Sequence, residues 1–293
     1  MAERVKDALQ RLDIRPTRTR GQNFVIQPAV IDAIISFGAP ASDEDLIEIG
    51  GGLGALTERL VAIAPRSLTV IEIEPQFCAE LKRRFPAISV ECADAREVDY
   101  RNFKKGSVVF GNLPYSFSTE ILFRLVDVAP HLSRAVLLLQ REFVDRLASP
   151  PGSREYGTIS VMAQLIADVR KGPIISGRSF HPPTEVESRV VELRFLAAPR
   201  VPVADRLWLR RVVKAAFHQR RKKLSNSLRS LGLGEENNLS QILSGIGIDP
   251  GRRAETLSLD EFVKMADTLR ALPRSEEPTP ATHTRRRKGG TRT

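Results

Sequence analysis

Short apolar segments alternate with helix-length segments up to about residue 197, and this alternation limits the possible folds more than any other feature of the sequence. Apolar side chains at helical spacing mark residues 55–64 and the segment that carries Phe77, Leu81 and Phe85. Strands that alternate with helices build a mostly parallel, doubly wound sheet. We therefore predict an α/β domain with strands at residues 45–49, 68–73, 88–91, 107–111, 134–139 and 190–195.

The remainder of the chain has a helical character and suggests further parts. Apolar residues recur at helical intervals in 207–231, 239–243 and 259–272, and glycines separate these segments. A chain of 293 residues also exceeds one typical domain. We predict an N-terminal arm at 1–20, a large α/β domain at 21–197, a Pro-containing linker at 198–203, a smaller all-α domain at 204–275 and a basic disordered tail at 276–293.

The composition excludes several classes of protein. It is 42% hydrophobic and 27% charged, as in ordinary globular proteins. There is no run of 18 apolar residues and no apolar leader, so we expect a cytoplasmic protein without a membrane segment. Cys78 and Cys92 are the only cysteines, they form no CxxC pair, and the four histidines are scattered. This argues against a disulfide framework or a zinc site, and we expect a monomer with no bound metal.

Positive charge is concentrated near the C-terminus. From Arg206 to Gly234 there are nine Lys or Arg and no acidic residue, and residues 278–293 add five more. These 14 cations exceed the formal net charge of +10, so the rest of the chain carries −4. A solvated helix surface, with a tail that only aids solubility, is one explanation. RNA is the explanation we favour, with phosphate contacts by Arg220, Arg221, Lys222 and Lys223.

A glycine-rich turn follows the predicted strand at 45–49 and opens the next helix. Its sequence, from Glu48 to Gly54, is Glu-Ile-Gly-Gly-Gly-Leu-Gly. Glycines there permit a tight turn and a close approach of the backbone to a ligand. Gly50, Gly52 and Ala55 also match the G-x-G-x-x-G/A pattern of dinucleotide-binding proteins. The turn alone therefore leaves an NAD-dependent oxidoreductase open.

Two acidic residues narrow the choice of ligand. Glu72, at the end of the second predicted strand, is placed to accept hydrogen bonds from both ribose hydroxyls of a nucleoside. Asp94, after the third, is placed to accept one from the adenine amine of the same ligand. Each acid alone could be a strand end or a helix cap. Together with the glycine turn they favour a nucleoside cofactor.

The segment Asn112, Leu113, Pro114 and Tyr115 follows the fourth predicted strand, at the edge where open α/β sheets bind ligands. The Asn112 side-chain oxygen and the Leu113 carbonyl can accept hydrogen bonds from an adenine amine, orient it and stabilise charge that develops on it. Pro114 stiffens the turn, and Tyr115 offers a face for stacking of an extruded base. A turn with a buried tyrosine is the alternative, but the position favours methylation of an adenine amine by S-adenosylmethionine.

Taken together, these motifs resemble the KsgA-type family of small-subunit ribosomal RNA adenine dimethyltransferases. The resemblance extends to about Leu272. The matching segments are 21–24, 48–57, 70–72, 94–95, 112–115, 139–147, 156–161, 180–188 and 217–228. Two departures from the family pattern, Thr184 and Glu185, remove a positive charge near the predicted target pocket.

The resemblance implies a Rossmann-like class I methyltransferase fold and a specific reaction. Two methyl groups would be transferred to each of two adjacent adenosines near the 3′ end of 16S rRNA, within the assembling 30S subunit. Tyr115 and Phe180 would stack on the target base. The implied contacts with S-adenosylmethionine are at Asn23, Val25, Gly50, Gly52, Glu72, Asp94, Ala95 and Asn112.

Three other interpretations remain open from the sequence. An Erm-type methyltransferase of large-subunit rRNA shares the cofactor turn and a similar Asn-x-Pro-aromatic motif, although residues 156–161 and 217–228 favour the KsgA type. A non-catalytic RNA-binding assembly factor would need only the cationic domain, but it leaves Asn112 and Tyr115 without a role. An oxidoreductase explains neither that motif nor the basic domain.

Overall fold

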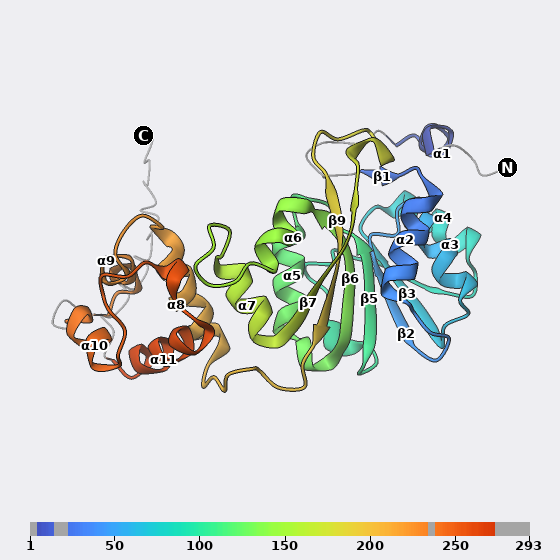
Figure 1. Cartoon of the computed structure of the whole chain (residues 1–293). Coiled ribbons are helices and arrows are strands. Elements are labelled where there is room, and N and C mark those ends of the chain that lie inside the picture. The colour runs from blue at the N-terminus through green and yellow to red at the C-terminus, as the bar shows by residue number, and fades with distance from the viewer. Residues whose placement is uncertain (1–4, 15–22, 234–237, 273–293) are drawn as a thin grey trace, which may run out of the picture.

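The fold is built on a seven-stranded sheet, seen in a computed structural model that describes residues 5–14, 23–233 and 238–272. The strand order is β4-β3-β2-β5-β6-β9-β7 (Figure 1). Strands β2 to β6 run parallel, and β9 is antiparallel to both of its neighbours. The predicted doubly wound, mostly parallel sheet is confirmed. Its strands are β2 (Asp45–Ile49), β3 (Ser67–Glu72), β4 (Ser89–Cys92), β5 (Ser107–Asn112), β6 (Leu132–Gln140), β7 (Ala167–Ile175) and β9 (Ser188–Phe195).

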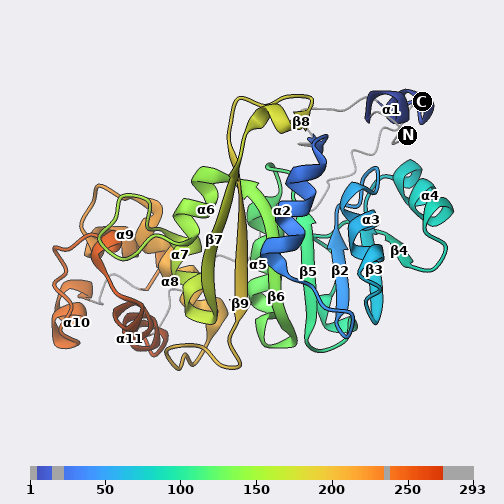
Figure 2. The same cartoon turned by 45° about the vertical axis from the view of Figure 1, so that its right-hand side comes forward.

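Helices cover both faces of this sheet (Figures 1 and 2). One face packs against α2 (Pro28–Gly38), α3 (Ala55–Ala62) and α4 (Pro75–Arg84). The other packs against α5 (Ser118–Asp127), α6 (Arg141–Leu147) and α7 (Thr158–Ile166). Because the central strands are buried on both sides, they are apolar runs rather than alternating patterns. All five residues of β2, for example, are buried.

The C-terminal part is helical, and none of the helices in the described residues is both long and apolar enough to span a bilayer. It contains α8 (Arg206–His218), α9 (Leu224–Ser227), α10 (Leu239–Gly245) and α11 (Leu259–Arg270). The long helical segment predicted at 207–231 is wrong, because α8 ends at His218 and the chain turns before Leu224. Residues 220–223 are all charged and exposed, so they offer no apolar face to bury in a continued helix.

A single apolar core joins the helical part to the α/β part. Val161, Met162 and Leu165 of α7 are buried together with residues of α8 and α11 such as Trp208 and Phe262. The predicted linker at 198–203 lies between β9 and α8, and Arg200 within it donates a hydrogen bond to the carbonyl oxygen of Gln164 at 2.8 Å. The division into domains stays a prediction. Side chains on the two sides of the predicted boundary pack against each other.

Several small elements were not predicted. β1 (Phe24–Val25) and β8 (Phe180–His181) form a separate two-stranded sheet. By contrast, the predicted N-terminal arm begins with Val5, Leu9 and Leu12 at helical spacing, and the structure has the helix α1 (Val5–Arg11) there. β7 was not predicted either. Its sequence is charged and contains Gly-Pro, which is typical of an edge strand and lacks the apolar run of a central one. Single 3-10 turns lie at Tyr100–Asn102, Ala129–His131, Gly177–Ser179, Leu228–Leu231 and Ala254–Thr256.

The expectation for the cysteines needs correction. Cys78 in α4 and Cys92 at the end of β4 are joined by a disulfide, with their Cα atoms 5.9 Å apart. The connection from β3 through α4 to the parallel neighbour β4 returns the chain to this position. A separation of 14 residues gave no such indication in the sequence.

Candidate active site

A cavity of about 570 Å³ opens at the carboxyl ends of β2, β3, β4 and β5. The chain passes from β2 to β3 on one side and returns to β5 on the other, so the cavity lies at the switch point of the sheet. Its volume is in the range of small-molecule sites. All eight residues predicted to contact the cofactor line it: Asn23, Val25, Gly50, Gly52, Glu72, Asp94, Ala95 and Asn112.

The glycine turn has the backbone conformation that its sequence requires. Gly50 and Gly52 have φ angles of +78° and +49°, in the left-handed region that favours glycine. A Cβ atom on Gly52 would also lie 3.3 Å from the ring of Phe24. The turn is attached to the neighbouring strand, since the Gly52 amide donates to Oε2 of Glu72 at 2.8 Å.

Glu72 is a buried carboxylate held by backbone donors. Its side chain is 6% exposed, and Oε1 accepts hydrogen bonds from the amides of Ile73 and Glu74 at 2.8 and 2.9 Å. Burial raises the pKa of Glu72, while these donors and Gly52 oppose the rise. A carboxylate has about four acceptor positions and the three amides use three of them, so one remains for a hydroxyl of a ligand.

Asp94 has a partner that was not predicted. The Arg96 guanidinium donates to both carboxylate oxygens of Asp94, with Nη2 at 2.6 Å from Oδ2, and lies 4.2 Å from the ring centroid of Phe117. The Arg96 side chain holds the pKa of Asp94 below its usual value. The predicted acceptor for an adenine amine is therefore ionised and oriented, and any ligand must share it with Arg96.

Glu48 is a buried acid in the cavity wall to which the sequence assigned no role. It is 1% exposed, and burial raises its pKa to about 8, with a further contribution from the Glu72 carboxylate. Hydrogen bonds with Thr57 of α3 oppose the rise in the pKa of Glu48.

Asn112 connects the end of β5 to the residue before β1. Its Nδ2 donates to the carbonyl oxygen of Asn23 at 3.0 Å, which defines the orientation of the amide. Because the donor end is used there, Oδ1 is the end that remains for a substrate amine. Leu113 and Pro114 line the same cavity.

The two residues predicted to stack on a base lie in different environments. Tyr115 lines the cavity and is half-buried, and its hydroxyl lies 2.6 Å from Oγ of Ser188. Phe180 is 1% exposed, packs in the apolar core with Val25, and does not line the cavity. Stacking by Phe180 stays a prediction that would require its ring to become accessible.

Further lining residues include Val5, Arg96 and Phe117. Arg96 and Phe117 each lie two residues after a predicted site residue, so proximity in the loop was a usable indication. Val5 comes from α1, and no sequence feature linked that helix to the cavity. Among the described residues, no group of three or more His, Cys, Asp or Glu is placed to hold a metal ion.

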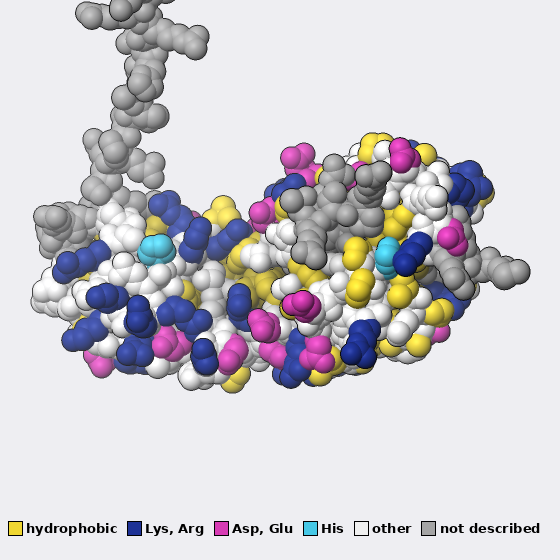
Figure 3. Space-filling model, turned by 90° about the horizontal axis from the view of Figure 1, so that it is seen from above, with side chains coloured by type: hydrophobic (Ala, Val, Ile, Leu, Met, Phe, Trp, Pro, Cys, Tyr) yellow, Lys and Arg dark blue, Asp and Glu magenta, His cyan; other side chains and the backbone are white. Residues whose placement is uncertain are grey.

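Lys and Arg side chains are spread over the helical part, at the left of Figure 3. The four cations predicted to bind RNA are all exposed: Arg220, Arg221, Lys222 and Lys223. Arg220 also donates to the carbonyl oxygens of Arg154 and Tyr156, the latter at 3.0 Å. Part of its function is thus to hold the loop before α7.

Two further cations, both in α8, contact the α/β part of the chain and do not extend into solvent alone. Arg206 donates to the carbonyl oxygen of Val126 at 2.5 Å. Arg210 pairs with Asp127 at 3.2 Å and lies 4.0 Å from the ring centroid of Phe123. The charge density of α8 therefore has a structural component that the sequence did not reveal.

The mostly parallel sheet, the glycine turn and the acids that follow the neighbouring strands define a class I methyltransferase fold. A family model described as ribosomal RNA adenine dimethylase matches residues 16–271. The chain belongs to this family of ribosomal RNA adenine dimethylases. Membership decides against the oxidoreductase interpretation.

Two similar bacterial proteins support the same family. Ribosomal RNA small subunit methyltransferase A of Syntrophotalea carbinolica is 42% identical over 258 residues, which cover 87% of this chain and 97% of that protein. The protein of the same name from Geobacter metallireducens is 40% identical over 268 residues, with coverages of 88% and 97%.

Solved structures agree in fold. A dimethyladenosine transferase from Plasmodium falciparum has a TM-score of 0.69 at 22% identity, covering 83% of this chain and 95% of that chain. The 23S rRNA methyltransferase ErmE has a TM-score of 0.62 at 21% identity, with coverages of 85% and 100%. At these identities the similarity establishes the shared architecture alone.

Proposed function

We propose that this protein uses S-adenosylmethionine to dimethylate the exocyclic amines of two adjacent adenosines near the 3′ end of 16S rRNA. It acts as a monomer in the cytoplasm, on the assembling 30S subunit. The observation that carries the proposal is that Asn112 and Tyr115 line the same cavity as the glycine turn and Glu72. The names of the relatives, which refer to the small ribosomal subunit, support the choice of RNA.

The described side chains fit the proposed cofactor. Glu72 would accept from one of its ribose hydroxyls and Asp94 from its adenine amine. Gly50 and Gly52 allow the backbone to approach it closely. When bound, S-adenosylmethionine supplies an electrophilic methyl group on a sulfonium.

The residues after β5 would prepare the nucleophile. An adenine amine is a poor nucleophile, because its lone pair is delocalised into the ring. Oδ1 of Asn112 and the carbonyl oxygen of Leu113 would accept hydrogen bonds from the amine, direct its nitrogen toward the cofactor cavity and stabilise positive charge that develops on it. Tyr115 would stack on the extruded base.

The test is to incubate the purified protein with tritiated S-adenosylmethionine and 30S particles that lack this modification, and then to digest the RNA. We expect dimethyladenosine in 16S rRNA. Its absence would contradict the proposal, and label in 23S rRNA when 50S particles are supplied would indicate an Erm-type target instead.

The variant Asn112→Ala tests the assigned chemistry. We expect methylation to fall at least 100-fold, the usual order for removing one preorganised acceptor or donor at a reacting centre, while particle binding survives. Thr119→Ala, an exposed change in α5 that lines no part of the cavity, is the matched control. Equal loss of particle binding in Asn112→Ala would show a structural role.

A further inference from the structure

Ser188 contacts Tyr115 from a position outside the cavity wall. It is the first residue of β9, its side chain is 0% exposed, and its Oγ lies 2.6 Å from the Tyr115 hydroxyl oxygen. This distance is within the normal range for a hydrogen bond between two hydroxyl groups. The contact spans 73 residues of sequence, so it depends on the fold.

The backbone of Ser188 is fixed on both sides. In the register of the sheet it lies opposite Gln140 of β6 and Ile175 of β7. β9 is thus paired along both edges at the point where the hydroxyl projects. A hydroxyl on such a strand is a rigid reference point for a neighbouring side chain.

The residues flanking Ser188 are anchored to α6. The Arg141 amide donates to the carbonyl oxygen of Glu187 at 2.9 Å, and the two side chains pair at 2.6 Å. On the other side, Arg189 pairs with Asp145 at 2.7 Å. Strand pairing and these contacts together restrict movement of Ser188.

Tyr115 has less support of its own. It lies in the turn between β5 and α5, it lines the cavity, and it is only half-buried. A tyrosine ring moves by rotation about the Cα–Cβ and Cβ–Cγ bonds. Because the hydroxyl oxygen lies on the Cβ–Cγ axis, a hydrogen bond there fixes the position of the ring by restraining the first rotation, and it acts on the second only through the preference of the phenol O–H for the ring plane. Without that restraint, part of the energy of base stacking would be spent on ordering the ring.

We infer that Ser188 is a positioning residue that holds the Tyr115 ring in the place where the target base stacks on it. The inference rests on the proposed function for its consequence in catalysis. The hydrogen bond itself can be tested without RNA or cofactor.

The first experiment uses ¹³Cζ-labelled tyrosine. The chain contains three tyrosines, so three resonances are expected, and Tyr115→Phe identifies one of them. We expect Ser188→Ala to shift the Tyr115 resonance and leave those of Tyr100 and Tyr156 in place. An unshifted Tyr115 resonance would overturn the inference.

The second experiment measures single-turnover methylation of 30S particles. Ser188→Ala and Tyr115→Phe each remove one side of the same bond, so both should slow methylation about tenfold, the factor that corresponds to one neutral hydrogen bond. Affinity for S-adenosylmethionine should be unchanged. In the Tyr115→Phe background, Ser188→Ala should cause no further loss.

The control is Ser160→Ala in α7. It removes an equally buried hydroxyl, which donates a hydrogen bond to the carbonyl oxygen of Arg146. It should lower stability without moving the Tyr115 resonance. A wild-type rate for Ser188→Ala, or equal losses from Ser188→Ala in both backgrounds, would refute a role through Tyr115. If the unaltered protein makes no dimethyladenosine, the proposed function fails, and the resonance experiment still decides on the bond.

Discussion

At the scale of single residues, the most unusual group is the Glu48 carboxyl. Burial raises its pKa to about 8, whereas an unfolded glutamate has a pKa near 4.5. Between these values the folded chain keeps a proton that the unfolded chain has lost. Stability contributed by the neutral form is therefore complete below pH 4.5 and declines as the pH rises toward 8.

Glu48→Gln should remove this pH dependence. The free energy of unfolding of the unaltered protein, relative to the variant, should fall by about 1.4 kcal/mol for each pH unit within this window. Urea denaturation at pH 5, 6, 7 and 8 measures the difference. A flat difference would contradict the assignment.

Glu80→Gln is the matched control for that measurement. The Arg83 and Arg11 side chains lower the pKa of Glu80 to about 2, so the stabilisation it gives is lost only as the pH falls below 4.5. Its effect should be constant from pH 5 to 8.

The sequence was sufficient to predict those site residues whose positions follow from the topology of the sheet alone. Gly50, Glu72, Asp94 and Asn112 each lie at or just after the last residue of a strand, and the carboxyl ends of parallel strands meet at one edge. Contacts such as that of Ser188 with Tyr115 depend on side chains from distant segments, so no local pattern encodes them.

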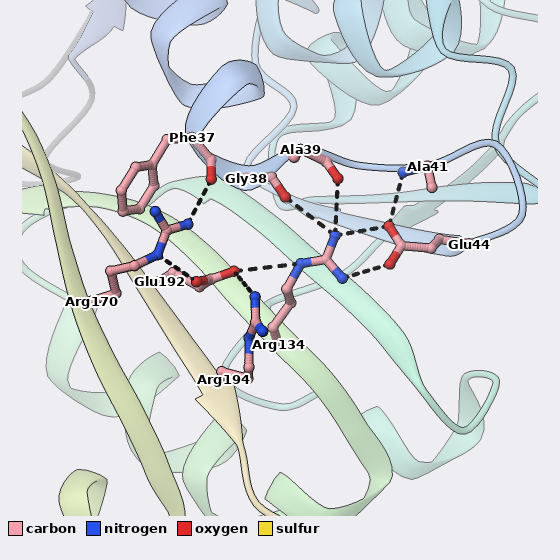
Figure 4. A network of polar contacts seen from close by, with 9 residues as sticks. All are labelled: Phe37, Gly38, Ala39, Ala41, Glu44, Arg134, Arg170, Glu192 and Arg194. Carbon is pink, nitrogen blue, oxygen red and sulfur yellow. Dashed lines mark hydrogen bonds and ion pairs between the residues drawn. The ribbon is translucent and has the colours of Figure 1, made fainter.

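At the scale of elements, a network of ion pairs links the neighbouring strands β6, β9 and β7 (Figure 4). Glu192 of β9 is 3% exposed and pairs with Arg170 of β7 at 2.9 Å and with Arg134 of β6 at 3.7 Å. Arg134 also pairs with Glu44, before β2. The edge strand that the sequence did not reveal is thus held partly by charge, as the apolar pattern of β7 is weak.

Glu192→Ala should destabilise the protein by about 3 kcal/mol, because it removes one of the two carboxylates that pair with the largely buried Arg134 guanidinium. Chemical denaturation checks this value. Arg194→Ala is the control, since Arg194 is 65% exposed and lies 3.5 Å from Glu192, and it should cost below about 1 kcal/mol. Equal effects of the two changes would contradict the network's assigned role.

The elements of the fold differ in how well the sequence predicts them. The predicted strand at 45–49 matches β2 at both ends, because an uninterrupted apolar run bounded by a glycine turn has one simple interpretation. The segment 207–231 was misjudged, because residues 220–223 turn the chain so that Arg220 reaches the carbonyl oxygens of Arg154 and Tyr156. That tertiary contact outweighs local helical spacing.

At the scale of the whole molecule, the exposed cations predict a salt effect. Replacing Arg221, Lys222 and Lys223 with Ala should flatten the dependence of log affinity for 16S rRNA on log salt concentration by about 2. Filter binding at several KCl concentrations from about 50 to 300 mM measures this slope. Affinity for S-adenosylmethionine should stay unchanged.

Arg220→Ala serves as a separate comparison. Because Arg220 holds the loop before α7, its loss should lower thermal stability, which the triple change should not do. An unaltered salt slope in the triple variant would refute phosphate contacts by this segment.

α7, α8 and α11 share one apolar core, so we expect the α/β and helical parts to unfold together. Calorimetry should give one heat-absorption peak, with van 't Hoff and calorimetric enthalpies that agree. A protein ended at residue 203 would leave Val161, Met162 and Leu165 facing solvent and should aggregate on expression. On this expectation the helical part covers apolar surface of the α/β part, in addition to any contribution to binding RNA.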